Sequence, residues 1–136
     1  MTRITFEQIY MNLAENLAKR STCKRLSVGC VITSSDYQRV LSVGYNGNAK
    51  GFPNKCDSNE PGKCGCIHAE ENALIKCSDI KEKKVIFITT SPCKMCSKKL
   101  INLGNIKKVF YRNDYRLNEG IDILKKAKIK VKKIIK

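Results

Sequence analysis

The feature that most constrains this chain is a pair of short motifs, HAE at residues 68–70 and PCKMC at residues 92–96. Together they supply one imidazole, two thiols and one carboxylate. An imidazole and two thiolates form a three-ligand zinc set, which leaves the fourth tetrahedral position to a water molecule. The carboxylate is close enough in sequence to reach that water without binding the metal itself. The pattern therefore predicts a catalytic zinc held by His68, Cys93 and Cys96, with Glu70 as the group that transfers protons.

The alternative to catalysis is a purely structural zinc, which normally has a fourth protein ligand. His68 is the only histidine of the chain and stands two residues before Glu70, so the sequence favours the catalytic interpretation. Both motifs are expected to begin helices. Free amide groups at a helix N-terminus stabilise thiolates and a developing oxyanion.

The length of 136 residues suits one zinc-dependent domain, residues 1–136, with a core that is stable without cross-links. No apolar run approaches the roughly 18 residues of a membrane helix, and the polar N-terminus lacks the apolar region of a signal peptide. These features predict a cytoplasmic protein. In that compartment the eight cysteines are expected to bind metal or take part in catalysis rather than to form disulfides.

The formal net charge of +15 has two interpretations. It is either a solvated lysine surface or a means of attracting a nucleotide phosphate or a nucleic acid. Residues 98–136 hold thirteen Lys and Arg against three acidic residues. Within residues 128–132, however, the lysines alternate with apolar residues, a pattern typical of a half-buried edge strand protected from aggregation.

Hydrophobic periodicity and turn residues predict strands that alternate with helices after an initial hairpin, which indicates an α/β fold. We expect three α/β/α layers, with a mixed five-stranded sheet and helices on both faces. A long loop rich in Gly, Asn, Pro, Lys and Cys should span residues 45–66, and a loop of this length is usually functional or tied by a metal. Helices are expected at 4–19, 66–76, 92–103 and 118–127, and strands at 28–33, 39–44, 84–89, 108–111 and 129–135.

Several further segments accompany the two motifs: RSTCKRLSVG (20–29), GYNG (44–47), IHAEENA (67–73), SPCKMC (91–96) and Tyr111 with Asp114-Tyr115. With these segments the sequence resembles the deoxycytidylate (dCMP) deaminases, bacterial and phage type, of the cytidine deaminase superfamily. An H-x-E motif followed by P-C-x-x-C is typical of zinc deaminases, and several further segments narrow the resemblance to the dCMP enzymes. It implies a cytidine deaminase-like fold and hydrolysis of dCMP to dUMP, with dCTP as a further candidate substrate, supplying the precursor of thymidylate.

The resemblance also implies residues that contact the substrate. Asn46 is expected to hydrogen-bond the sugar and base, the Ala69 amide to hold the oxyanion, and Tyr115 to close over the base. The alternatives are a plain Asn-Gly turn and a packing tyrosine. The segment before the first strand offers phosphate contacts, each of which is otherwise a surface charge: Arg20, Lys24 and Arg25.

Seven other residues have ionisable side chains of interest, Glu71 and the six cysteines outside the PCKMC motif. Glu71 is expected to be a solvated helix residue, and Cys30 and Cys77 small core residues. Some phage members of the resembled family carry a second zinc that ties the corresponding loop, with His or Glu at some positions where this chain has Cys. The resemblance therefore implies a second, structural zinc, and the alternative is scattered free thiols: Cys23, Cys56, Cys64 and Cys66.

Other functions compete with the dCMP deaminase hypothesis. A tRNA adenosine deaminase shares the PCxMC motif, but GYNG and RSTC favour the nucleotide enzyme. A single-stranded DNA editing enzyme is disfavoured because the chain has no Trp and few aromatic residues for base stacking. A zinc-stabilised nucleic-acid-binding module would fit the charge and leave HAE unexplained. The resemblance also implies a homo-oligomer, with a hexamer favoured, and a location in the host cytoplasm if the chain is viral.

Overall fold

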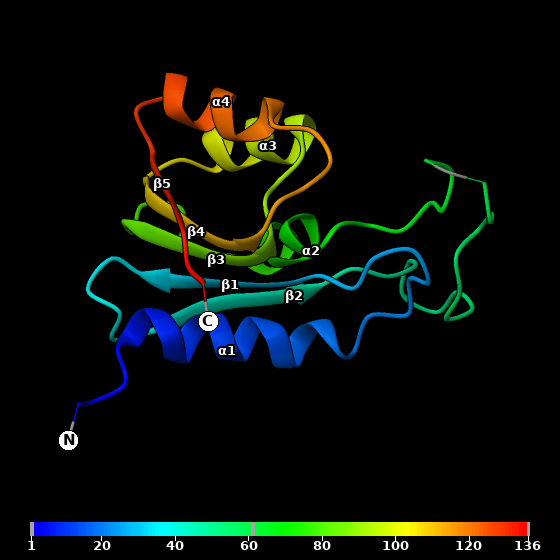
Figure 1. The fold of residues 1–136 in the computed structure, drawn as a ribbon, viewed down its shortest axis with the longest axis horizontal. Helices are drawn as coiled ribbons and strands as arrows, with labels where there is room; N and C mark the ends of the chain where they lie inside the picture. The colour runs from blue at the N-terminus through cyan, green and yellow to red at the C-terminus, as the bar shows by residue number, and fades with distance from the viewer. Residues whose placement is uncertain (1, 61, 136) are drawn as a thin grey trace.

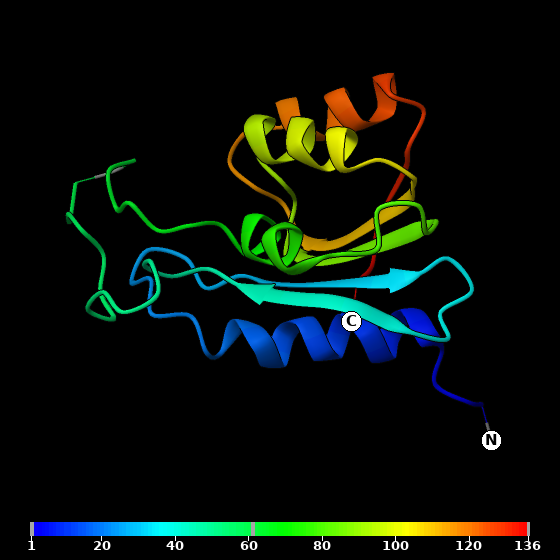
Figure 2. The same cartoon turned by 180° about the vertical axis from the view of Figure 1, so that it is seen from behind.

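The computed structural model describes residues 2–60 and 62–135 of the chain. Its helices and strands alternate after an initial helix and hairpin, as the sequence predicts. The long loop between the hairpin and the second helix projects from one end of the molecule in both views (Figure 1, Figure 2). The elements are α1 (Phe6–Ala18), β1 (Gly29–Ser34), β2 (Val40–Tyr45), α2 (Ala69–Lys76), β3 (Lys84–Thr90), α3 (Lys94–Leu103), β4 (Ile106–Asn113), α4 (Glu119–Lys126) and β5 (Lys130–Lys133).

The five strands form one sheet in the order β2-β1-β3-β4-β5. β1 pairs antiparallel with β2 and β3, whereas β3, β4 and β5 run parallel. This mixed sheet confirms the prediction. β5 lies at one edge with Lys130 and Lys132 exposed, as expected for a strand whose charges discourage edge-to-edge pairing.

Figure 1 shows α1 on one face of the sheet and α2, α3 and α4 on the other, so the fold has three α/β/α layers. The central strand β3 is buried along its whole length and faces both layers. Phe87 packs with Met11 of α1 in one apolar cluster, and Ile86 packs with Ala73 of α2 and Leu100 of α3 in the other. The strand therefore consists almost wholly of apolar and small residues, as is usual for a strand covered on both sides.

Two glycines of the hairpin let helices approach the sheet closely. A Cβ added at Gly29 would lie 1.9 Å from the carbonyl oxygen of Ala14 in α1. A Cβ added at Gly44 would lie 2.4 Å from the carbonyl oxygen of Ala69 in α2. The position of α2, whose first turn contains the HAE motif, is thus set by the absence of a side chain on β2.

Several element boundaries differ from the predicted ones. α2 begins at Ala69 rather than at Cys66, because His68 is an extended N-cap residue with φ −69° and ψ 155°. α3 likewise begins after the N-cap residue Cys93, so Pro92 precedes the helix instead of lying in its first turn. β4 is longer than predicted because it pairs with neighbours on both sides, whereas the edge strand β5 is shorter. In the described part of the chain no helix is long and apolar enough to cross a membrane.

Candidate functional site

The three predicted metal ligands lie together at the starts of two helices. His68 is the N-cap residue of α2, and Cys93 is the N-cap residue of α3. The Nδ1 atom of His68 lies 3.7 Å from Sγ of Cys93 and 3.3 Å from Sγ of Cys96. Zinc bonds of usual length at tetrahedral angles would place such nitrogen and sulfur atoms about 3.6 Å apart. The donor set therefore fits a zinc ion.

Hydrogen bonds among the three predicted ligands favour the thiolate form of Cys93. The pKa of Cys93 is lowered to about 4, mainly by a hydrogen bond from the side chain of Cys96 and then by one from His68. The backbone N–H of Cys96 also donates to Sγ of Cys93, at 3.5 Å. In turn the hydrogen bond with Cys93 raises the pKa of His68 to about 9. The chain thus holds one ligand in the form that binds metal.

Glu70 lies beside these ligands in the first turn of α2 and is only 3% exposed. Burial raises the pKa of its carboxyl group to about 7. A group with a pKa near neutrality can both accept and donate a proton, as an acid–base catalyst must.

Cys30 of β1 is fully buried in the core. Burial and the charge of Glu70 raise the pKa of the Cys30 thiol. Cys30 and Cys77 are both buried, which confirms their expected place in the core.

A cavity of about 60 Å³ joins Glu70 and two of the predicted metal ligands, His68 and Cys93, to residues from four other segments. Its volume corresponds to about two water molecules. The expected contacts Asn46, Ala69 and Tyr115 line the cavity. So do three residues that sequence reasoning missed, although two of them directly precede the PCKMC motif: Val28, Thr90 and Ser91.

Hydrogen bonds fix the positions of two of these lining residues, Asn46 and Tyr115. The side chain of Asn46 accepts a hydrogen bond from the N–H of Val28 at 2.8 Å and donates one to the carbonyl oxygen of Leu26 at 2.6 Å. It is 6% exposed, so its amide is fixed between the β2 end and the segment before β1. The backbone N–H of Tyr115 donates to Oγ of Ser91 at 2.8 Å. This bond ties the segment after β4 to the segment that leads to Cys93.

The three basic residues expected to contact a phosphate are not among the residues that line this cavity. The guanidinium of Arg20 lies over the ring of Tyr45, 5.9 Å from its centroid. Arg25 donates from Nη1 to the carbonyl oxygen of Asn59 in the long loop, at 3.3 Å. Lys24 lines a separate cavity of about 450 Å³ within that loop. Their role as phosphate contacts stays a prediction.

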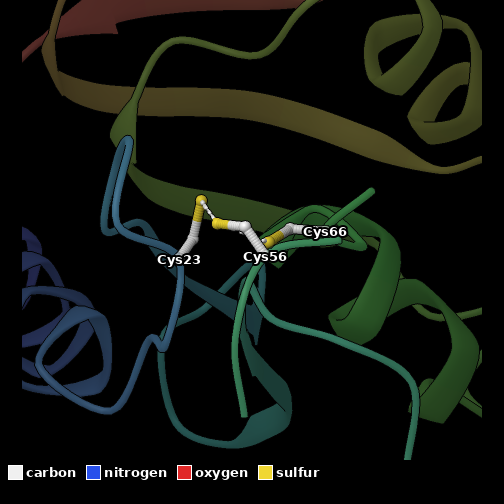
Figure 3. Close-up of side chains that lie close together, drawn as sticks. All are labelled: Cys23, Cys56 and Cys66. Carbon is white, nitrogen blue, oxygen red and sulfur yellow. Dashed lines mark hydrogen bonds between the residues drawn. The ribbon is translucent and has the colours of Figure 1, made fainter. Parts of the chain in front are cut away.

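A second group of thiols lies where three separate segments meet (Figure 3). Sγ of Cys56 is 3.6 Å from Sγ of Cys23 and 3.9 Å from Sγ of Cys66, and all three sulfurs lie within 4.8 Å of one another. Tetrahedral zinc bonds of about 2.3 Å would separate two sulfurs by about 3.8 Å. The spacing therefore fits a metal and is far longer than a disulfide bond.

Cys64 was predicted to complete this second set, and the structure does not bring it into the group. It lies on the same long loop, where its carbonyl oxygen accepts a hydrogen bond from the N–H of Asp57 at 2.7 Å. The three thiols that do meet come from the segment before β1, the long loop and the segment before α2. Spacing in the sequence alone could not separate Cys64 from Cys66, because only the path of the loop decides which thiol faces the group.

The sheet order, the three layers and the His-Cys-Cys set beside a buried glutamate define a zinc-dependent deaminase domain. The profile of the cytidine and deoxycytidylate deaminase zinc-binding region matches residues 4–113. The chain belongs to this family.

Individual relatives are more specific. The chain is 34% identical to the dCMP deaminase of cyanophage S-TIM5, whose crystal structure is a complex with dCMP and dUMP. That structure superposes on this one with a TM-score of 0.85. The match covers 98% of this chain and 100% of the phage chain. It is 31% identical to the deoxycytidylate deaminase of Mycobacterium phage D29 over 82% of this chain and 97% of the relative. It is 35% identical to the deoxycytidylate deaminase of Schizosaccharomyces pombe, over 85% of this chain and only 39% of that protein. The chain thus spans less than half the length of this yeast relative.

Proposed function

We propose that the chain catalyses the hydrolytic deamination of dCMP to dUMP. The observation that carries this proposal is the set His68, Cys93 and Cys96 beside the buried carboxyl group of Glu70, which lines one cavity together with His68 and Cys93. The likeness to the cyanophage S-TIM5 enzyme, which covers 98% of this chain and whose structure contains dCMP and dUMP, supports this choice of substrate.

The reaction replaces the C4–N4 bond of cytosine with a C4–O bond and consumes water while it releases ammonia. His68, Cys93 and Cys96 would hold zinc, which when bound lowers the pKa of a water molecule toward about 7. Glu70 would take a proton from the attacking water molecule and deliver it to the ring nitrogen N3. Glu70 then moves the second proton to the departing amine, so one carboxylate serves first as base and then as acid. The backbone N–H of Ala69, at the start of α2, faces the developing negative charge.

The competing functions differ in the substrate that they require, above all in its phosphate groups. Ammonia release should be compared side by side for dCMP, dCTP, deoxycytidine and a tRNA anticodon hairpin. We expect dCMP to react much faster than deoxycytidine, with a rate that falls as salt rises. A faster reaction with dCTP would shift the preferred substrate to the triphosphate. A faster reaction with the hairpin would replace our proposal by a tRNA adenosine deaminase.

We further propose that Cys23, Cys56 and Cys66 hold a second zinc, with Cys64 as the fourth ligand after a local shift of the loop. Four thiolates would close this site to water, so its role would be structural. It would pin the long loop against the segment before β1 and the start of α2. Metal analysis of the purified protein should then find two zinc ions per chain, and Cys64→Ser should weaken one of them.

Assembly into a hexamer and a cytoplasmic location are proposals that follow from the resembled family. The thymidylate precursor role follows in the same way. Light scattering of the purified protein measures the mass of the assembly, and a mass of one chain would contradict an oligomer.

A further inference from the structure

Glu71 joins the two halves of the predicted metal site. Its Oε1 accepts a hydrogen bond from the backbone N–H of His68 at 2.9 Å, which forms the returning half of a capping box at the start of α2. Its Oε2 forms an ion pair with Nζ of Lys99 in α3. The side chain of Glu71 is 23% exposed. It is therefore not the freely solvated helix residue that the sequence suggests.

Through its ion pair with Glu71, Lys99 connects α3 to α2. It lies in α3 one turn after Cys96, on the helix that supplies both thiol ligands. His68, the third ligand, precedes α2. The predicted ligands are thus divided between the starts of α2 and α3. The distance between these two helix starts decides whether Nδ1 of His68 lies close enough to both cysteine sulfurs to share one metal ion with them. The chain of contacts from the His68 backbone through Glu71 to Lys99 spans that division.

We propose that Glu71 and Lys99 are positioning residues that hold the backbone of His68 in place relative to Cys93 and Cys96 and thereby strengthen metal binding. Neither residue lines the cavity that contains Glu70, so neither is expected to touch the substrate. The inference rests on the zinc site of the proposed function but not on the identity of the substrate. A partner that orients a metal ligand typically raises metal affinity by about 10- to 100-fold, whereas an ordinary surface ion pair would leave that affinity unchanged.

The test compares metal retention by the folded holoprotein and its variants. Lys99→Met removes the cation and leaves the Glu71 cap intact. Glu71→Gln keeps an acceptor for the His68 N–H and removes the charge, while Lys99→Arg preserves the ion pair. Lys98→Met is the matched control, because Lys98 is the neighbouring exposed lysine of α3. Cobalt-substituted protein is titrated with a chromophoric chelator, since the absorption of a site with two sulfurs and one nitrogen differs from that of an all-sulfur site.

We expect Lys99→Met and Glu71→Gln each to lose metal from the nitrogen-containing site at about 10- to 100-fold lower chelator concentration. The double variant Glu71→Gln/Lys99→Met should bind metal only slightly more weakly than either single variant, because both changes break the same ion pair. Lys99→Arg and Lys98→Met should match the parent chain. Retention by Lys99→Met and Glu71→Gln equal to that of Lys98→Met would overturn the proposal.

Kinetics provide a second readout. In the two weakened variants kcat for dCMP should fall with metal occupancy and recover with added zinc, while KM stays unchanged. A raised KM with full metal occupancy would overturn the positioning role, because it would place the pair in substrate binding. If the parent chain failed to deaminate dCMP, the proposed function would fail, but metal retention would still decide the role of Glu71 and Lys99.

Discussion

The contact between β2 and α2 makes Gly44→Ala a sharp test of how the fold positions the catalytic machinery. A Cβ at this position would lie 2.4 Å from the carbonyl oxygen of Ala69 and 2.6 Å from the backbone nitrogen of Ala73. Both neighbours are helix backbone and cannot rotate away as a side chain could. Ordinary contacts of a Cβ begin near 3.4 Å, so α2 must move away from the sheet by about 1 Å.

This displacement affects stability and activity together. Overpacking of a well-packed core costs about 1–3 kcal/mol, which should lower the urea midpoint of unfolding by about 1 M. Ala69 lies between His68 and Glu70, so the same shift moves a metal ligand and the proton-transferring group. A misplacement of about 1 Å reduces turnover by about 100-fold. We therefore expect kcat/KM for dCMP to fall by about this factor even in the fraction that stays folded.

Urea denaturation followed by circular dichroism measures the first effect, and ammonia release from dCMP measures the second. Val40→Ala is the control on the same strand, because Val40 is 46% exposed and its loss should change the free energy of unfolding by no more than about 0.5 kcal/mol. A Gly44→Ala variant with the parent's urea midpoint and kcat/KM would refute the packing argument.

Four further changes test other parts of the molecule. Glu70→Gln should keep its zinc and lose about 10²–10⁴-fold in kcat; near-normal turnover would contradict the mechanism. Arg25→Ala should raise KM for dCMP more than for deoxycytidine, and equal effects would make its contact with the long loop purely structural. Cys56→Ser should lower Tm and remove one zinc while the catalytic zinc stays; unchanged Tm and zinc content would leave these cysteines as free thiols. Lys84→Met should cost about 1–3 kcal/mol in urea unfolding, because the buried ammonium donates to three backbone carbonyl oxygens; exposed Lys83→Met is its control.

Two of the predicted metal ligands are related by local geometry. Cys93 and Cys96 are three residues apart, and a helix that begins at Cys93 brings their sulfurs together without help from the rest of the chain. The N-cap of α1 is local in the same way, because the hydroxyl of Thr5 accepts a hydrogen bond from the N–H of Gln8 three residues later. The alternation of strands and helices, and with it the α/β layers, follows from hydrophobic periodicity in the same way.

The sequence by itself therefore determined the type of fold and indicated the helix starts that present the candidate metal ligands, because short-range geometry links these features. The tertiary structure alone decided which residues from distant segments face one another. It brought Cys23, Cys56 and Cys66 together without Cys64, and it paired Glu71 with Lys99 across two helices. Such contacts depend on how α2 and the long loop pack against the sheet, and that packing is the sum of many weak interactions that no local pattern records.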